Sequence, residues 1–373
     1  MKLHVVWLTS TEAAVANFSF VWLVSALLAM FSLSAFRSLA PNLGLLDTPN
    51  ERKVHAGQIP LVGGLSAYLG CAVALFLFAP IGPELFLFLL CSGVLVGVGV
   101  LDDAWDLPAM FRLGVQVSVG AVLVLGSGQY LADLGDLVGM GPVLLGTTMG
   151  VLVSIAAVIG ATNAFNMVDG IDGLLGSLSL VTLLALAYLF SASGAHTQEL
   201  LLTIGIAVAL IPYLLANLQV LDRGGKVFFG DAGSMFIGFA VVWLLICATQ
   251  GEQAVMRPVT ALWIIAVPLM DMVAIMIRRA RKGQSMMLPD KEHLHHIFLR
   301  AGFTQRQTLL VITFVAVLMA AFGLIGEALG VAEWVMFAVF LAVFAAYDWS
   351  LQHVWRLLRL FRYDLVRSAR RLR

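Results

Sequence analysis

Three aspartates lie close together where a long apolar stretch ends: Asp102, Asp103 and Asp106 in LDDAWD. Carboxylates this near to one another repel each other, and they attract water or cations. If a helix continues through them, Asp102 and Asp106 share one face at i, i+4, and Asp103 lies on an adjoining face. Such a cluster suits a magnesium ion with its waters, or a cation paired with substrate phosphates. A solvated helix end that terminates the apolar segment is the alternative interpretation.

A second polar series follows in NAFNMVDGIDGLLGS, where Asn163, Asn166, Asp169 and Asp172 recur every three residues. Short polar side chains at this spacing, at the end of an apolar stretch, are difficult to explain as packing. The interleaved glycines let the backbone approach a ligand closely. We therefore interpret the series as a ligand site, with a capped helix end as the alternative.

A third stretch, FFGDAGS, places Asp231 in a glycine-containing turn directly before another apolar run. Backbone amides at the start of a helix suit phosphate oxygens, and the aspartate suits a metal ion. The stretch is therefore a candidate phosphate and metal site.

Basic and histidine side chains form two further groups. Lys53 and His55, in PNERKVH, are a cluster suited to phosphate. The stretch RRARKGQSMMLPDKEHLHHIFLRAGF holds Arg281, His293, His295, His296 and Arg300. No familiar zinc spacing includes the three histidines, so hydrogen bonding to sugar and phosphate oxygens is the better interpretation. For the arginines, a role as topology anchors is the alternative.

The elements that position these residues are predicted to be membrane-spanning helices. The chain of 373 residues is 61% hydrophobic and 12% charged, with no net charge, which predicts no nucleic-acid partner. Apolar runs of about 20 residues fit helices that cross a bilayer. The fold class is therefore an all-α polytopic membrane protein with about eleven transmembrane helices. The expected spans are 18–36, 60–79, 84–101, 110–127, 143–163, 174–191, 200–218, 234–250, 258–277, 307–326 and 332–349.

Lysine and arginine set the expected orientation. When the loops are assigned alternately to two sides, all of the 22 basic residues except Lys2 and Arg257 fall on one side. The positive-inside rule makes that side cytoplasmic, with a periplasmic N-terminus and a cytoplasmic C-terminus. Residues 1–349 then form a single integral-membrane domain whose chemistry-bearing loops face the cytoplasm. Residues 350–373 form a basic amphipathic cytoplasmic tail suited to anionic headgroups.

In combination, these stretches resemble the polyprenyl-phosphate N-acetylhexosamine-1-phosphate transferases. The resemblance covers nearly the whole chain, in the order PNERKVH…PLVGG, LDDAWD, NAFNMVDGIDGL, GDAGS and HLHHIFLRAGF. Within the family, IPLVGG, RRARKG and HLHHIFLRAGFTQRQ are similar to the bacterial undecaprenyl-phosphate N-acetylglucosaminyl 1-phosphate transferases. The muramoyl-pentapeptide branch reads PTMGG where this chain reads PLVGG, which makes a peptide-bearing sugar a poorer expectation.

The resemblance implies a reaction, partners and residue roles. N-acetylglucosamine 1-phosphate would pass from UDP-N-acetylglucosamine to undecaprenyl phosphate, releasing UMP, with Mg²⁺ as cofactor or Mn²⁺ in its place. The implied catalytic residues are Asp102, Asp103, Asp169 and Asp231, and the implied metal ligands are Asp231 and Asn166. The implied substrate-binding residues are Lys53, His55, Asn163, Asp172, Arg281, His293, His295, His296 and Arg300. The expected setting is the bacterial inner membrane, among membrane lipid, with the active site on its cytoplasmic face. The expected pathway is O-antigen or other surface glycan synthesis, and family members often pair as homodimers.

Two alternatives remain open at the level of sequence. One is the same reaction with another UDP-N-acetylhexosamine. The other is a transporter, which would place ionisable groups near the bilayer midplane. Asp271 is the one carboxylate of that kind, since it lies inside an expected span. It either faces the site from within the membrane or stabilises a helix contact.

Overall fold

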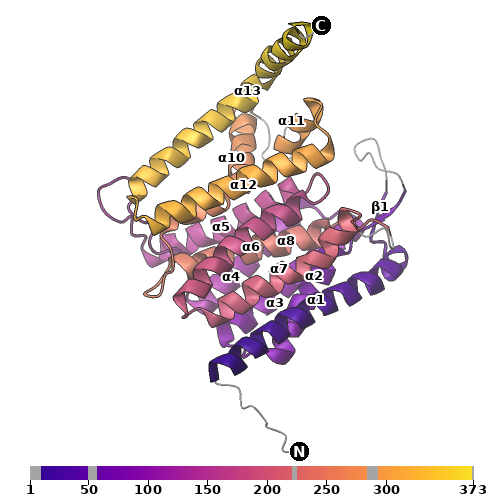
Figure 1. The fold of residues 1–373 in the computed structure, drawn as a ribbon. Helices are drawn as coiled ribbons and strands as arrows, with labels where there is room; N and C mark the ends of the chain where they lie inside the picture. Colours follow the sequence, from indigo (N-terminus) through magenta and orange to yellow (C-terminus); the bar gives the residue numbers. More distant parts are fainter. Residues whose placement is uncertain (1–9, 49–56, 221–224, 284–292, 372–373) are drawn as a thin grey trace, which may run out of the picture.

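The computed structural model describes residues 10–48, 57–220, 225–283 and 293–371, with side chains over 18–48, 57–220, 225–283 and 293–353. These residues form helices joined by short turns, with one small sheet (Figure 1). The helices are α1 (Ser10–Leu43), α2 (Gly63–Phe78), α3 (Pro83–Trp105), α4 (Ala109–Ser127), α5 (Thr147–Val168), α6 (Leu174–Ser193), α7 (Thr197–Asn217), α8 (Gly230–Thr249), α9 (Pro258–Ile264), α10 (Ala266–Arg281), α11 (Leu294–Arg300), α12 (Gln305–Ala328) and α13 (Glu333–Arg371). The strands are β1 (Leu46–Asp47) and β2 (Ile59–Pro60).

The all-α membrane fold is confirmed. Over the described ranges, nine helices are long and apolar enough to cross a membrane. Two of the eleven predicted spans take another form: α2 has only 16 residues, and α9 and α10 meet at a bend of 84°. Each predicted span nevertheless coincides with a helix or with this bent pair. The count of eleven crossings stays a prediction.

The bend between α9 and α10 has a local cause in the sequence. Pro268 lacks a backbone N–H, and its ring clashes with the carbonyl four residues earlier, which belongs to Ile264. Helix α9 ends at that residue, and Ile265 leaves the helical conformation with φ −106° and ψ 21°. The buried hydroxyl of Thr182 on α6 donates to the Ile264 carbonyl at 3.4 Å. A broken helix is tolerated in a bilayer when a neighbour bonds the freed group in this way.

Helix α8 is the centre of the bundle. It packs against α2, α3, α5 and α6, and its most apolar stretch of 18 residues is completely buried. A helix that is apolar on every side is stable only in such a place. Small residues allow the close approach: a Cβ on Gly99 of α3 or on Gly64 of α2 would overlap the backbone of α8 at Ala232 and Gly233 respectively.

The start of α8 is tied to the loop that precedes α2. Strand β1 pairs antiparallel with β2, and Leu61 just after β2 bridges to Phe228. The amide of Gly63 then donates to the Phe228 carbonyl at 3.0 Å, and that of Gly64 to the Phe229 carbonyl at 2.9 Å. These backbone bonds fix where α8 begins.

Helix α13 runs without a break from the bundle to Arg371, so the expected boundary between residues 349 and 350 falls inside it. Figure 1 shows the first turns of α1 and the last turns of α13 at opposite ends of the bundle. The side chains after residue 353, which include the predicted basic face of the tail, lie outside the described part. The domain division and the orientation of the termini stay predictions.

Gly99→Ala should destabilise the protein, because the new methyl group has no space between α3 and α8. Overpacking of this kind costs about 1–3 kcal/mol of unfolding free energy. Gly97→Ala is the matched control, since a Cβ at Gly97 on the same helix meets nothing within 4 Å. Thermal unfolding in detergent measures both variants. Equal stability of the two would contradict the tight contact between α3 and α8.

Candidate active site

The carboxylate of Asp103, at the end of α3, binds the first turn of α8. Its Oδ1 accepts from the amide of Asp231 at 2.8 Å, and its Oδ2 from the amide of Ala232 at 3.3 Å. Gly230 precedes them with φ +80°, and a Cβ there would crowd the Asp103 carboxylate. The sequence analysis assigned these helix-start amides to phosphate. The structure gives them to Asp103, which thereby positions Asp231.

Asp102 and Asp231 share one cation. Arg112 Nη1, from the first turns of α4, forms an ion pair with Asp102 Oδ2 and lies 3.4 Å from Asp231 Oδ2. The Asp102 side chain is 1% exposed, and its Oδ1 accepts from the Leu107 amide at 2.8 Å. Arg112 is not among the site residues expected from the sequence. The feature of the sequence that could have indicated it is a single arginine near the start of an otherwise apolar span.

Asp106 does not join this cluster. Helix α3 ends at Trp105, and Asp106 takes a left-handed backbone conformation with φ 52° and an exposed side chain. The i, i+4 face expected for Asp102 and Asp106 therefore does not form, because the helix stops one residue too early.

Asn166, in the last turn of α5, completes the surroundings of Asp231. Its Nδ2 donates to Asp231 Oδ1 and, at 2.9 Å, to the hydroxyl of Ser234. Which end of the amide faces the carboxylate is assigned from this bonding pattern, and a half-turn presents Oδ1 instead. The Asp231 side chain is 35% exposed and thus accessible from outside the protein.

These two side chains fit a magnesium ion. Mg²⁺ prefers oxygen ligands, keeps several waters, and is held in enzymes by one or two carboxylates together with substrate phosphates. Asp231 offers a carboxylate, and Asn166 offers an amide oxygen. The described ranges hold no group of three or more His, Cys, Asp or Glu side chains that would form a complete protein cage. The fit is to an ion shared with substrate.

Asp169 and Asp172 lie in the turn between α5 and α6. Burial raises the pKa of Asp169 to about 7, and the charges of Asp231 and Asp172 add to the shift. A carboxyl with this pKa exchanges its proton near neutral pH. Asp172 Oδ2 forms an ion pair with Lys226 Nζ at 2.7 Å, and Lys226 also lies over the ring of Phe228.

Asn163 lies on α5 three residues before Asn166, and its side chain contacts helix α4. Its Nδ2 donates to Gln116 Oε1 on α4 at 3.2 Å and to the Ile159 carbonyl at 2.7 Å. Asn217 is a buried amide that was not expected from the sequence. Its Oδ1 accepts from the Gly173 amide at 2.6 Å, and its Nδ2 donates to the Val227 carbonyl at 2.8 Å. Asn217 thereby joins the Asp172 turn to the segment that leads into α8.

The three histidines form one cluster beside that turn, in which His293 and His295 are stacked and His296 is tilted against both. The rings of His293 and His295 are parallel within 5° at 5.7 Å, and His295 and His296 are 4.2 Å apart. His295 packs so tightly on Gly170 that a Cβ at Gly170 would overlap its imidazole. The structure thus brings the histidine segment to the Asp169–Asp172 turn.

Asp271 connects α10 to the histidine segment. Its Oδ2 lies 3.0 Å from His293 Nδ1, and its Oδ1 accepts from the Leu294 amide at 3.1 Å and from the Tyr347 hydroxyl at 2.9 Å. Of the two roles left open for Asp271, the structure favours the helix contact, and its partner is the histidine segment itself.

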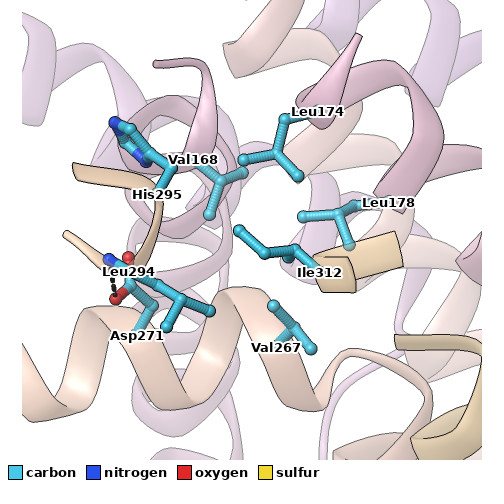
Figure 2. Close-up of a pocket in the computed structure, with 8 residues that line it drawn as sticks. All are labelled: Val168, Leu174, Leu178, Val267, Asp271, Leu294, His295 and Ile312. Atoms are coloured by element: carbon cyan, nitrogen blue, oxygen red, sulfur yellow. Dashed lines mark hydrogen bonds between the residues drawn. The ribbon is translucent and has the colours of Figure 1, made fainter. Parts of the chain in front are cut away.

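A small cavity of about 10 Å³ lies beside this contact (Figure 2). Its lining is apolar apart from Asp271 and His295, and Figure 2 shows the His295 ring turned away from the apolar side chains of Leu178 and Ile312. A cavity of this size is at the lower limit for one water molecule. It is therefore a packing defect and not a substrate pocket.

The remaining predicted site residues lie at the edge. Arg281, at the end of α10, is 61% exposed and lies 3.5 Å from Asp348 Oδ2 on α13. Arg300 is exposed at the end of α11. Lys53 and His55 lie outside the described residues.

Acid should destabilise the protein partly through His295. Burial, followed by the nearby His296 and His293, lowers the pKa of His295 from 6.5 to about 3. The folded state keeps the ring neutral, whereas the unfolded chain takes up a proton below pH 6.5. The free energy of unfolding therefore falls as the pH drops from about 6.5 towards 3.

His295→Gln removes this proton uptake, so the variant should lose less stability on acidification than the unaltered chain. Thermal unfolding in detergent at neutral and mildly acidic pH measures the difference. His353→Gln is the control, because that ring is only partly buried on α13. An identical loss for all three chains would contradict the assignment to His295.

The family model "Glycosyl transferase family 4" matches residues 85–249, from the start of α3 to the end of α8. A protein of Yersinia pestis is 47% identical over 348 residues, covering 93% of this chain and 94% of its own length. A protein of Escherichia coli (strain K12) is 44% identical and covers 90% of each chain. A protein of Haemophilus influenzae is 44% identical over 358 residues, covering 94% and 98%.

All three relatives carry the name undecaprenyl-phosphate alpha-N-acetylglucosaminyl 1-phosphate transferase. The match to residues 85–249 includes the Asp102–Asp103 pair, the Asp169–Asp172 turn and Asp231. The relatives extend the likeness through the histidine segment to most of the chain, which confirms the resemblance drawn from the motifs. The chain therefore belongs to glycosyl transferase family 4 and, within it, to the phosphoglycosyl transferases named undecaprenyl-phosphate alpha-N-acetylglucosaminyl 1-phosphate transferases.

Proposed function

We propose that this protein transfers N-acetylglucosamine 1-phosphate from UDP-N-acetylglucosamine to undecaprenyl phosphate and releases UMP. The observation that carries the proposal is the meeting of Asp102, Asp103 and Asp231 with Asn166 and Arg112 at the ends of α3, α4, α5 and α8. Carboxylates around one cationic centre suit a reaction between two anionic phosphates. The transporter alternative depended on Asp271 inside a span, and that carboxylate is bonded to the histidine segment and to α13.

The metal proposed for this reaction is Mg²⁺, with Mn²⁺ as a substitute, held by Asp231 and Asn166. When bound, such an ion would neutralise charge on the transferring phosphoryl group and on the phosphate of the leaving UMP. Asp103 fixes the position of Asp231 through the two amides that it binds. Without the ion, Asn166 Nδ2 donates to Asp231 Oδ1, and the half-turn that presents the amide oxygen to the ion would replace this hydrogen bond.

Arg112 supplies the other positive charge. Its guanidinium lies between Asp102 and Asp231, where it offsets two carboxylates that would otherwise repel the substrate phosphates. Arginine presents several N–H donors in a fixed plane, which suits phosphate oxygens. Asp102 is buried and bonded to Arg112 and to a backbone amide, so its role in this proposal is to hold the guanidinium at the site.

The acceptor does not need a strong base. A phosphate monoester has its second pKa near 6 and is already mostly dianionic at neutral pH. Direct attack of the lipid phosphate on the donor β-phosphate is therefore preferred over a covalent aspartyl intermediate. The protein supplies alignment of the two phosphates, which alone accounts for a large part of rate acceleration in such reactions.

The donor contacts are proposed for the turn and the histidine segment. Asp172 meets the uracil, and Lys226 lies close enough to share that contact because it is paired with Asp172. His293, His295 and His296 face the sugar and its diphosphate. Asp169 is proposed as a catalytic neighbour of Asp231. Five further substrate-binding residues are proposed from the sequence resemblance: Asn163, Lys53, His55, Arg281 and Arg300.

The proposed location is the cytoplasmic surface of the bacterial inner membrane. There the isoprenoid chain stays among membrane lipids while its phosphate meets a soluble nucleotide sugar. The lipid-linked product would begin O-antigen or another surface glycan. We also propose that the protein forms a homodimer, as the resemblance implies.

Asp231→Asn should lower transfer by about 100-fold or more, because the ligand charge at the reacting phosphates is lost. Asp106→Asn is the matched control: that side chain is exposed, lies outside the cluster, and sits in a left-handed conformation that asparagine also accepts. It should keep activity close to that of the unaltered chain. Near-normal turnover of Asp231→Asn, with normal insertion, would remove Asp231 as a metal ligand.

Transfer of labelled sugar phosphate tests the function directly. Purified protein is mixed with undecaprenyl phosphate and UDP-N-acetylglucosamine, with Mg²⁺ or with EDTA, and UDP-N-acetylgalactosamine is run in parallel. We expect lipid product and UMP from the first donor only, and only with Mg²⁺. Product from the second donor alone would keep the reaction and change the sugar. No product from either donor, with folded protein, would contradict the proposal.

The same assay in sealed membrane vesicles tests the orientation, because a nucleotide sugar does not cross the bilayer. Inside-out vesicles should form product from added donor, whereas right-side-out vesicles should not until detergent opens them. The opposite result would reverse the topology and move the site to the periplasmic face.

A further inference from the structure

Asp271 is a carboxylate buried among membrane helices, with 1% of its surface exposed. It lies in α10, between one and two turns past the bend at Ile265, and its described hydrogen-bond partners come from other segments of the chain. Burying a carboxylate is costly unless its hydrogen bonds are excellent, and an apolar side chain of similar size often packs there at no loss of stability. A buried aspartate in such a place is therefore expected to orient the groups that it binds.

The two oxygens of Asp271 have different tasks. Oδ1 is held by two donors, the amide of Leu294 on α11 at 3.1 Å and the hydroxyl of Tyr347 on α13 at 2.9 Å. Oδ2 is left for His293 Nδ1 at 3.0 Å. Because an ionised carboxylate can only accept, Nδ1 carries the proton. Nε2 is then the nitrogen of His293 that remains for a ligand.

We propose that Asp271 and Tyr347 are positioning residues for His293, and that they fix its ring plane and its tautomer so that Nε2 is presented to the sugar diphosphate of the donor. This inference rests on the proposed function, since it takes His293 to contact the donor. Neither residue touches substrate. They act through the imidazole, as a carboxylate does when it orients a metal-bound or catalytic histidine.

The effect of this contact extends past His293. Its ring lies parallel to that of His295, and His295 packs against Gly170 in the turn that carries Asp169 and Asp172. A tilt of His293 would therefore shift the neighbouring ring against that turn. Helix α13, which also contacts α10 through the pair of Arg281 and Asp348, would thus help to set the donor side of the active site.

A double-mutant cycle tests the inference. Asp271→Asn should lower kcat/KM for the UDP-sugar by about 10-fold or more, the usual effect of removing an orienting partner, and leave KM for undecaprenyl phosphate unchanged. Tyr347→Phe removes only the hydroxyl and should cost less, on the same parameter. In a His293→Gln background, Asp271→Asn should add less than about 2-fold, because its effect passes through the missing imidazole.

Tyr68→Phe is the matched control. That hydroxyl donates to the Leu89 carbonyl at 2.8 Å, between α2 and α3, and its loss should leave kcat/KM unchanged. Thermal unfolding of every variant identifies losses caused by misfolding. Full additivity of Asp271→Asn and His293→Gln in folded protein would overturn the inference, since it would make Asp271 a purely structural residue.

A second measurement does not depend on activity. Nitrogen NMR of histidine-labelled protein distinguishes the two imidazole tautomers, and His293→Gln assigns the signal among the seven histidines. We expect His293 to be protonated on Nδ1, and this preference to be lost in Asp271→Asn. Protonation on Nε2 alone would overturn the inference. If the tautomer is as expected but no UDP-sugar is a donor, the proposed function fails while the positioning contact stands.

Discussion

The hydrogen bonds from the amides of Asp231 and Ala232 to the carboxylate of Asp103 join the end of α3 to the start of α8, and the active site is arranged around that junction. Helix α8 is enclosed by its neighbours, so its first turn is where its polar groups reach the surface of the bundle. The junction fixes Asp231 against Asn166 of α5 and Arg112 of α4. Four helices thus meet at one carboxylate.

Such a cluster is stable because its charges are offset within it. Asp102, Asp103 and Asp231 would repel one another strongly in a medium of low dielectric constant. Arg112 lies between two of them, backbone amides bind the third, and Asn166 donates to Asp231. The arrangement keeps Asp231 partly exposed while the other carboxyl groups hold it in place. In the proposed reaction, a metal ion and two phosphates would then enter a site in which, apart from the half-turn of Asn166, the protein groups are already oriented.

The proposed donor side depends on a different constraint, which is the break between α9 and α10. Pro268 ends α9, and the 84° bend redirects α10 so that Asp271 meets the histidine segment and α13. The bend would leave the buried Ile264 carbonyl without this donor if Thr182 did not bond it. Asp271 is paired with groups from other segments in the same way, and those pairs are the ones proposed to orient His293.

The sequence by itself determined the helical membrane fold, because apolar runs of spanning length leave the backbone few alternatives in lipid. It also determined the polar clusters of the candidate site and the family, since motif order and spacing are local properties. Arg112, Asn217, Lys226 and Tyr347 were found only in the tertiary structure, because each is a single polar residue whose partner lies far away in the chain. The exclusion of Asp106 was decided by the residue at which α3 ends, and the role of Asp271 by a bend that turns one helix towards two others. Contacts between distant segments depend on how the helices pack, and no local pattern encodes that packing.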